Sequence, residues 1–266
     1  MKSESVNGDK FSRFGFSTER GGAHLARTMM LAELEHLLDH VSKPTSRREG
    51  YVRAIEEDNC LGKRSGRTRK LTARHLADLY GLDPSATIFR ALRYFWGRDP
   101  EGRPLLACLC AYARDPILRM SAPFVLRMSE GQLFSREALE AYLDKKQPGR
   151  FSKSTLRSTA QNAASTWTQS GQLTGKMNKR RSRANATPGA TAYALFLGFL
   201  LGARGLTLFE SEYAKLLDCP FDRAVELAEV ASQRGWIVFK RIGSVVEALF
   251  PNLLEQRELE WTREQG

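Results

Sequence analysis

Apolar residues recur at three- and four-residue steps through the first 125 residues, and no run in this stretch alternates as a β-strand would. Breaks at Pro44, Gly81, Pro100 and Pro116 divide the stretch into helices. The helices that we expect cover about 22–41, 46–59, 71–80, 84–97 and 103–113. The pattern predicts a helical bundle over residues 21–125, preceded by a flexible polar lead over residues 1–20.

Two helix starts in this bundle are predicted from local chemistry. Thr45 or Ser46 is expected to cap the second helix, because Glu49 follows Ser46 at the spacing of a capping box. Leu71-Thr72 is expected to begin the third helix, after a basic stretch that starts near Leu61.

Between Ser135 and Thr187 the pattern changes to helix, tight turn, helix and basic hairpin. Ser135 is placed to cap a helix with the sequence REALEAYLDKK, and Gln147-Pro148-Gly149 makes a turn. Ser152 or Ser154 then caps a helix over 155–170, and the segment MNKRRSRANATPG follows as a hairpin or loop. This order of elements is that of a winged helix-turn-helix, in which the second helix faces the major groove of DNA.

The C-terminal third repeats the same order without the basic charge. A buried helix over 193–203 and a helix over 211–217 precede a helix over 221–234, and two strands surround Gly243-Ser244. The helix over 221–234 carries Asp222, Glu226 and Glu229, which would repel phosphates, so this unit is expected to pack on protein. The fold class is therefore mainly α, with an N-terminal helical bundle and winged-helix-like units carrying short β-hairpins. We place these units at about 135–187 and 192–251 within a region over 126–253, followed by a polar tail over 254–266.

Charge is distributed unevenly along the chain. Lys and Arg number 41 against 30 Asp and Glu, which gives a net charge of +11. Residues 145–209 contain no Asp or Glu and eleven Lys or Arg, and residues 61–77 contain no acid and six bases. A surface without carboxylates suits a polyanion, because each cation that neutralises a phosphate releases a counterion. The alternative is a pair of solvated loops that lack acids by chance.

The residues that we expect to contact DNA come from these two acid-free segments. Cations of the hairpin would grip the backbone, the outer face of the helix over 155–170 would face the groove, and the cations near Lys63 would add a second phosphate contact. The predicted contacts are Lys63, Arg64, Arg67, Arg69, Lys70, Lys153, Arg157, Gln161, Asn162, Lys176, Lys179, Arg180, Arg181 and Arg183.

The sequence shows no catalytic or cofactor motif. Neither Gly62-Lys63 nor Gly175-Lys176 has the glycine spacing of a phosphate-binding loop, and nucleophile-elbow and zincin motifs are absent. His36 and His40 stand four apart, but we interpret them as surface residues. We therefore expect a non-enzymatic protein without metal or cofactor.

Four cysteines without Cys-x-x-Cys spacing indicate reduced thiols. The polar N-terminus lacks the apolar core of a signal peptide, and the most apolar run, over 193–203, is too short to span a membrane. A cytoplasmic protein without membrane contact is expected.

Several short motifs resemble one protein family. They are Asn59-x-Leu61-x-Lys63-Arg64, Thr68-x-Lys70-Leu71-Thr72, Ser165-x-Trp167-Thr168-Gln169-Ser170-Gly171-x-Leu173, Tyr193-Ala194-Leu195 and Leu200-x-Gly202. Together they are similar to the BrxA family, the small accessory component of BREX bacteriophage-exclusion systems. The resemblance spans about residues 20–253. It implies a mostly helical DNA-binding protein that acts beside a methyltransferase, a phosphatase-like protein and ATPases, with no catalytic residues of its own.

The function expected is thus a double-stranded-DNA-binding accessory protein of a phage-defence system. Two other functions fit the same sequence: an adaptor that docks acidic partner proteins, and a winged-helix transcription regulator. RNA binding has less support, because no aromatic-studded sheet or Gly-x-x-Gly loop is present. The sequence is also compatible with a homodimer.

Overall fold

The protein is mainly helical, at 58% helix, and the residues that the structure describes form thirteen α-helices and two short antiparallel β-hairpins. A computed structural model describes residues 11–17, 21–43 and 46–263. The N-terminal elements are η1 (Ala23–Leu25), α2 (Leu31–His40), α3 (Arg48–Glu56), α4 (Gly66–Tyr80), α5 (Thr87–Trp96), η2 (Pro100–Gly102), α6 (Arg103–Arg114) and α7 (Pro116–Leu126). The expected helical bundle is confirmed.

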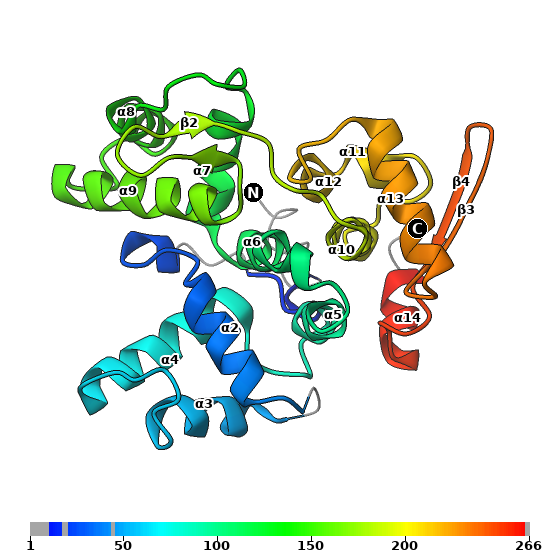
Figure 1. Ribbon diagram of the computed structural model, residues 1–266, viewed down its shortest axis with the longest axis horizontal. Coiled ribbons are helices and arrows are strands. Elements are labelled where there is room, and N and C mark those ends of the chain that lie inside the picture. Colours follow the sequence, from blue (N-terminus) through cyan, green and yellow to red (C-terminus); the bar gives the residue numbers. More distant parts are fainter. Residues whose placement is uncertain (1–10, 18–20, 44–45, 264–266) are drawn as a thin grey trace.

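Helix α6 forms the centre of the molecule, with α4, α5, α7 and α10 (Pro188–Leu200) packed around it (Figure 1). Every residue from Leu105 to Ala113 is buried, because the run LLACLCAYA is apolar on all sides of the helix. Cys108 and Cys110 are fully buried within it, and burial raises the pKa of their thiols to about 12 and about 11. One continuous hydrophobic core therefore joins the N-terminal bundle to the C-terminal half.

Three predicted helix starts in the bundle are corrected. The helix expected from residue 22 is divided into η1 and α2, with Met30 in a left-handed conformation between them. Helix α3 begins after Arg47 without a side-chain cap, so the Ser46–Glu49 capping box is wrong, and Thr45 lies outside the described residues. Helix α4 begins at Gly66 rather than at Leu71, because Ser65 caps it by accepting a hydrogen bond from the N–H of Thr68.

The first winged-helix unit is predicted over about 135–187, where α8 (Arg136–Lys146), α9 (Lys153–Gln169) and the hairpin of β1 (Leu173–Thr174) and β2 (Arg180–Arg181) lie. Its first helix is α7, which the sequence pattern did not predict and which also packs on α6 of the bundle, so the unit begins earlier than expected. Leu133, between α7 and α8, pairs with Arg180 and adds a third strand position to the hairpin. The N-caps predicted at Ser135 and Ser152 are both confirmed. The order helix, strand position, helix, helix, hairpin is the order of a winged helix-turn-helix.

The second unit follows directly. It consists of α10, α11 (Thr207–Glu210), α12 (Glu212–Lys215), α13 (Phe221–Gln233), β3 (Val238–Ile242) and β4 (Val245–Leu249). Strands β3 and β4 pair in register from Val238↔Leu249 to Ile242↔Val245, so the predicted hairpin around Gly243-Ser244 is confirmed. Helix α10 is buried on nearly every side and packs against α12 and α13, as expected for the first helix of the unit.

Both polar ends contribute to the fold, which corrects the expected lead and tail. Phe14 and Phe16 are buried in the core, although they belong to the segment expected to be flexible. The expected tail contains α14 (Gln256–Arg263), whose buried Glu258 accepts hydrogen bonds from Thr87 and Arg90 of α5. The remainder of both segments, residues 1–10, 18–20 and 264–266, lies outside the described residues.

Among the helices described, none combines the length and the hydropathy needed to cross a bilayer.

Buried Asp115 joins three elements of the fold. Its carboxylate caps α7 by accepting hydrogen bonds from the N–H groups of Ile117 and Leu118 at 2.8 and 3.0 Å, and a third from the N–H of His24 at 3.0 Å. Nδ1 of His24 lies 2.9 Å from the same carboxylate, and its Nε2 lies 2.8 Å from Oγ1 of Thr166 in α9. These contacts fix η1 between α7 and α9.

Acid is expected to destabilise the protein through Asp115. Burial pushes the pKa of Asp115 upward, but the His24 ring and the backbone donors outweigh burial and bring it to about 2. An unfolded Asp has a pKa of about 3.9, so this carboxylate stabilises the folded state above that pH and loses its contribution as the pH falls toward 2. Replacing Asp115 with Asn should flatten the dependence of the unfolding free energy on pH by about 2 kcal/mol between pH ~5 and pH ~2.

Urea titrations over this pH range measure the effect. Asp222→Asn, at an exposed position of α13, is the matched control. Equal slopes for Asp115→Asn and the original protein would contradict the prediction.

Candidate nucleic-acid interface

The first half of α9 presents cationic and polar side chains to solvent. Lys153, Arg157 and Gln161 lie on its exposed face, so the outward position predicted for Arg157 and Gln161 is confirmed. Ser152 accepts one of the N–H groups that begin the helix, from Thr155 at 3.2 Å, and the remaining N–H groups carry the positive end of the helix dipole. This end of α9 is therefore suited to an anion.

The second half of α9 is covered by the segment that contains η1. Asn162 donates a hydrogen bond from Nδ2 to the carbonyl of His24 at 3.1 Å, and Thr166 accepts one from the N–H of Met29 at 2.8 Å. Asn162 is half-buried as a result, so its predicted role of facing a DNA groove is corrected to a structural contact. No local pattern indicates this contact, because the two residues are 138 positions apart.

Most of the basic stretch over 61–77 lies on α4. Arg64, Arg67 and Lys70 are exposed around the start of the helix, and Arg69 is half-buried. Lys63 is neutralised in part by Glu33 of α2, whose carboxylate lies 3.1 Å from its Nζ. The early start of α4 fixes these cations on a helix end, where the sequence predicted a loop.

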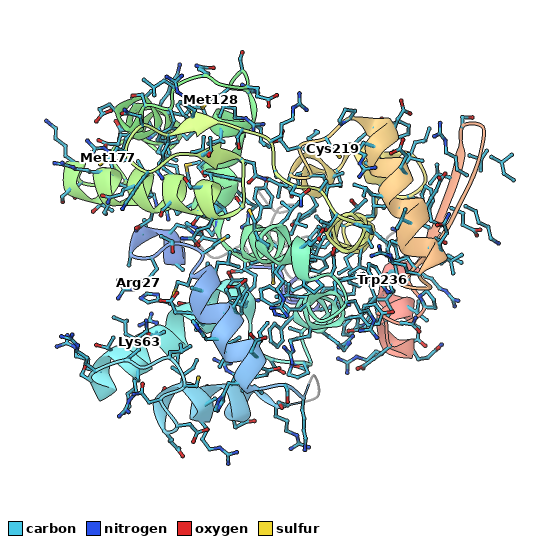
Figure 2. All side chains as sticks on the ribbon, in the orientation of Figure 1. Arg27, Lys63, Met128, Met177, Cys219 and Trp236 are labelled. Carbon is cyan, nitrogen blue, oxygen red and sulfur yellow. The ribbon has the colours of Figure 1, made fainter. Side chains whose placement is uncertain are left out.

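A groove of about 340 Å³ brings the two acid-free segments together. Lys63 and Thr68 line it from one side and Asn162 of α9 from the other, with Arg27 and Glu33 between them. Figure 1 shows the starts of α4 and α9 at the same side of the molecule, and Figure 2 places Lys63, Arg27 and Met177 there as well. The sequence does not predict Arg27 as a site residue, because it lies within the helix expected over 22–41 and outside both acid-free segments.

The loop over 175–179, between β1 and β2, forms the wing of the first unit. Lys176 is exposed at its tip, beside Met177, which is 90% exposed. Lys179 folds back and donates a hydrogen bond to Oγ1 of Thr168 at 2.9 Å, and partial burial lowers the pKa of its ammonium group. The wing therefore presents one fully free lysine and one tethered lysine.

The three arginines that follow the wing have different surroundings. Arg180 is exposed and donates to the carbonyl of Gly131 at 2.9 Å. Arg181 is buried in a two-pronged ion pair with Asp218, with both N···O distances 2.6 Å. Arg183 is exposed but lies 3.0 Å from the carboxylate of Glu130. The expectation that Arg181 grips phosphate is corrected, because its charge is already neutralised inside the fold.

Six of the predicted contact cations are exposed and have no side-chain hydrogen bond or ion pair among the residues described. They are Arg64, Arg67, Lys70, Lys153, Arg157 and Lys176. These six side chains and the groove of about 340 Å³ between α4 and α9 are called the basic face below. Free cations on one side of a protein produce a field that attracts and orients a polyanion.

The second winged-helix unit has the opposite charge on the corresponding helix. Asp222, Glu226 and Glu229 are exposed on α13, and Arg223 is paired with Glu226 at 2.9 Å. Its hairpin is apolar at the tip, where Ile242 is 82% and Val245 is 70% exposed. A surface of this kind repels phosphates, so only the first unit has the features of a nucleic-acid interface.

In the part of the chain that the structure describes, no three His, Cys, Asp or Glu residues are grouped to hold a metal ion. His40 instead lies near Asp58, at 3.7 Å.

No protein-family model and no curated protein matches this sequence.

Proposed function

We propose that the protein binds double-stranded DNA through the basic face. The observation that carries this proposal is the meeting of the two acid-free segments at one groove, which Lys63 and Thr68 line from the first segment and Asn162 from the second. The six exposed cations of the basic face have no hydrogen-bond or ion-pair partner within the described residues, so their charge is available to phosphates.

The first turns of α9 are the part that would enter the major groove. In winged and unwinged helix-turn-helix proteins, the N-terminal residues of the second helix contact base edges. Arg157 can donate to O6 and N7 of guanine, and Gln161 can donate to N7 and accept from the N6 amino group of adenine. Arg64, Arg67 and Lys70 of α4 would contact the phosphate backbone beside it, and Lys176 of the wing would contact it on the other side.

The biological setting that we propose is an accessory role in bacteriophage exclusion. It is supported by the motifs that resemble the BrxA family, such as Ser165-x-Trp167-Thr168-Gln169. In this setting the protein has no catalytic step of its own and brings DNA to the enzymes of the system. Co-purification of the tagged protein with a methyltransferase from its own host would support this role, and recovery of the protein alone would contradict it.

DNA affinity should fall steeply with salt if the basic face is the interface. Each phosphate contact contributes a slope of about −0.9 to a plot of log K against log salt, so six contacts predict a slope of about −5. Fluorescence anisotropy with a duplex of about 25 base pairs, at several salt concentrations, measures it.

An RNA duplex and a single strand of the same length are the comparison ligands. Preference for either over the DNA duplex would contradict binding to double-stranded DNA. A slope near zero, or tight binding of an acidic partner protein in place of DNA, would indicate the adaptor function instead.

A further inference from the structure

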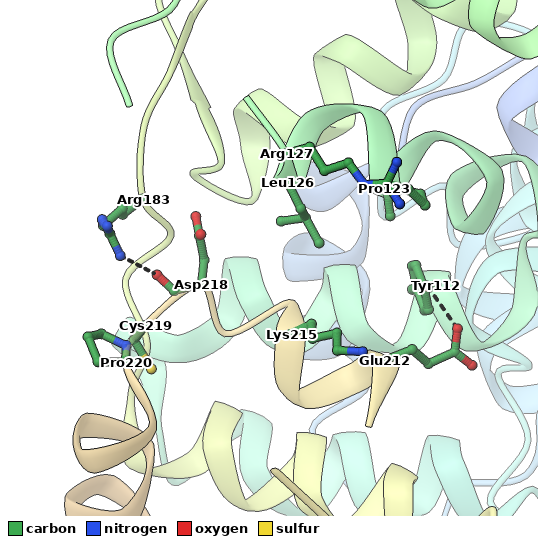
Figure 3. Close-up of a pocket in the computed structure, with 11 residues that line it drawn as sticks. Tyr112, Pro123, Leu126, Arg127, Arg183, Glu212, Lys215, Asp218, Cys219 and Pro220 are labelled. Carbon is green, nitrogen blue, oxygen red and sulfur yellow. Dashed lines mark hydrogen bonds between the residues drawn. The ribbon is translucent and has the colours of Figure 1, made fainter. Parts of the chain in front are cut away.

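A second cavity lies on the other side of the first winged-helix unit, away from the basic face. Its volume is about 740 Å³, within the range of small-molecule sites. Leu126 and Arg127, at the end of α7, line one wall, and α12 and the turn at Pro220 line the other (Figure 3). Tyr112 of α6 also lines it. The cavity therefore has walls from both winged-helix units.

The carboxylates of this cavity are already engaged. Asp218 is held by Arg181 at 2.6 Å, and Glu212 accepts a hydrogen bond from the hydroxyl of Tyr112 at 2.9 Å. At the mouth, Arg183 is paired with Glu130 and also donates to the carbonyl of Asp218 at 3.4 Å. Arg181 neutralises Asp218, whereas Glu212 keeps its negative charge near Lys215, because the hydroxyl of Tyr112 that it binds is neutral.

Two cations of the cavity are free. Arg127 and Lys215 form no side-chain hydrogen bond or ion pair among the residues described. They extend from opposite walls, Arg127 beside Pro123 and Lys215 toward Glu212 (Figure 3). An anionic group between them would receive charge-assisted hydrogen bonds from both sides.

The rest of the lining is apolar. Ala122, Pro123 and Leu126 of α7 face Cys219 and Pro220 across the cavity. Small-molecule sites combine such apolar walls with a few polar groups that fix the orientation of the ligand. We propose that the cavity binds a small organic anion with a flat apolar body, whose charge Arg127 and Lys215 hold. Both a nucleoside monophosphate and an aromatic carboxylate have this chemistry. Bound there, the ligand would connect the two winged-helix units.

Cys219 gives a direct readout of occupancy. It lines the cavity and is half-buried, as is Cys60, which lies outside it. Cys108 and Cys110 are buried with strongly raised pKa values, so alkylation of the native protein should be confined to the first two. The rates at Cys219 and Cys60, followed by mass spectrometry with iodoacetamide, therefore compare the cavity with an internal control.

The probe is anilinonaphthalene sulfonate, an aromatic anion of the proposed class. At saturation it should slow alkylation of Cys219 by about fivefold or more and leave Cys60 unchanged. The double variant Arg127→Gln, Lys215→Gln should need about tenfold more probe for the same protection, because two charge-assisted contacts are lost. Lys240→Gln with Arg257→Gln removes the same charge outside the cavity and should behave like the original protein.

Competition then identifies the source of the anion. Adenosine monophosphate and naphthoate, added as displacing ligands, distinguish a nucleotide from a carboxylate. The proposal is overturned if the double variant is protected like the original protein, if phenylnaphthylamine, which lacks the sulfonate, protects equally well, or if Cys60 is protected to the same extent. It is also overturned if an acidic peptide protects Cys219 better than any small anion, which would make the cavity a docking site for protein. None of these outcomes depends on whether the basic face binds DNA.

Discussion

Replacing Arg64, Arg67, Lys153 and Arg157 with glutamate is expected to weaken binding to a DNA duplex by about 4 × 10³-fold at ~0.1 M salt. At this salt concentration each phosphate contact contributes about a factor of eight to affinity, so the loss of four contacts accounts for the change. The slope of log K against log salt should also fall in magnitude by about four units. All four side chains are exposed and free of partners within the described chain, so stability should change little.

A matched variant separates the basic face from the net charge of the protein. Arg223, Arg234, Lys240 and Arg257 are also exposed, and they belong to the second winged-helix unit and α14 or to the residues beside them. Their replacement by glutamate makes the same change in net charge. We expect this variant to lose less than tenfold in affinity, through long-range repulsion alone. Equal losses in the two variants would show that no single face binds DNA, and unchanged affinity in the first would exclude the basic face altogether.

The winged-helix order could be predicted from the sequence because each of its signals is local. Ser135 and Ser152 are N-caps whose partners lie three residues ahead, and Gly243-Ser244 is a two-residue hairpin turn. The apolar spacing of Leu156, Ala160 and Trp167 likewise gives the buried face of α9 directly. Signals of this kind act within a few residues, so they are visible without any knowledge of tertiary contacts.

The burial of the second half of α9 under the segment that contains η1 could not be predicted, because it depends on contacts between distant segments. His24 and Met29 reach Thr166 across more than a hundred residues, and Asn162 contacts a backbone carbonyl that any residue could supply. The same contacts interrupt the helix that the spacing around Met29 predicts. Helical periodicity there reflects burial of the segment, and burial does not require the segment to be one continuous helix.

The neighbouring arginines of β2 lead to the largest expected effect on stability. Successive side chains of a strand point to opposite faces, so Arg180 is exposed whereas Arg181 is 5% exposed against Asp218. Arg181→Ala leaves a carboxylate in the fold without its partner and should lower the unfolding free energy by about 3–5 kcal/mol. Arg180→Ala should change it by less than about 0.5 kcal/mol and should instead reduce DNA affinity if this side chain reaches a phosphate.

A double variant tests whether the cost arises from the unpaired carboxylate. Arg181→Met together with Asp218→Asn removes both charges, and it should recover at least half of the stability that Arg181→Ala loses, since a buried pair replaced as a unit is often nearly neutral. Urea unfolding of the original protein, Arg181→Ala, Arg180→Ala and the double variant compares their free energies of unfolding. Equal stability of Arg181→Ala and Arg180→Ala would show that the ion pair with Asp218 does not hold β2 to the second winged-helix unit. Arg181 would then again be a candidate contact to DNA.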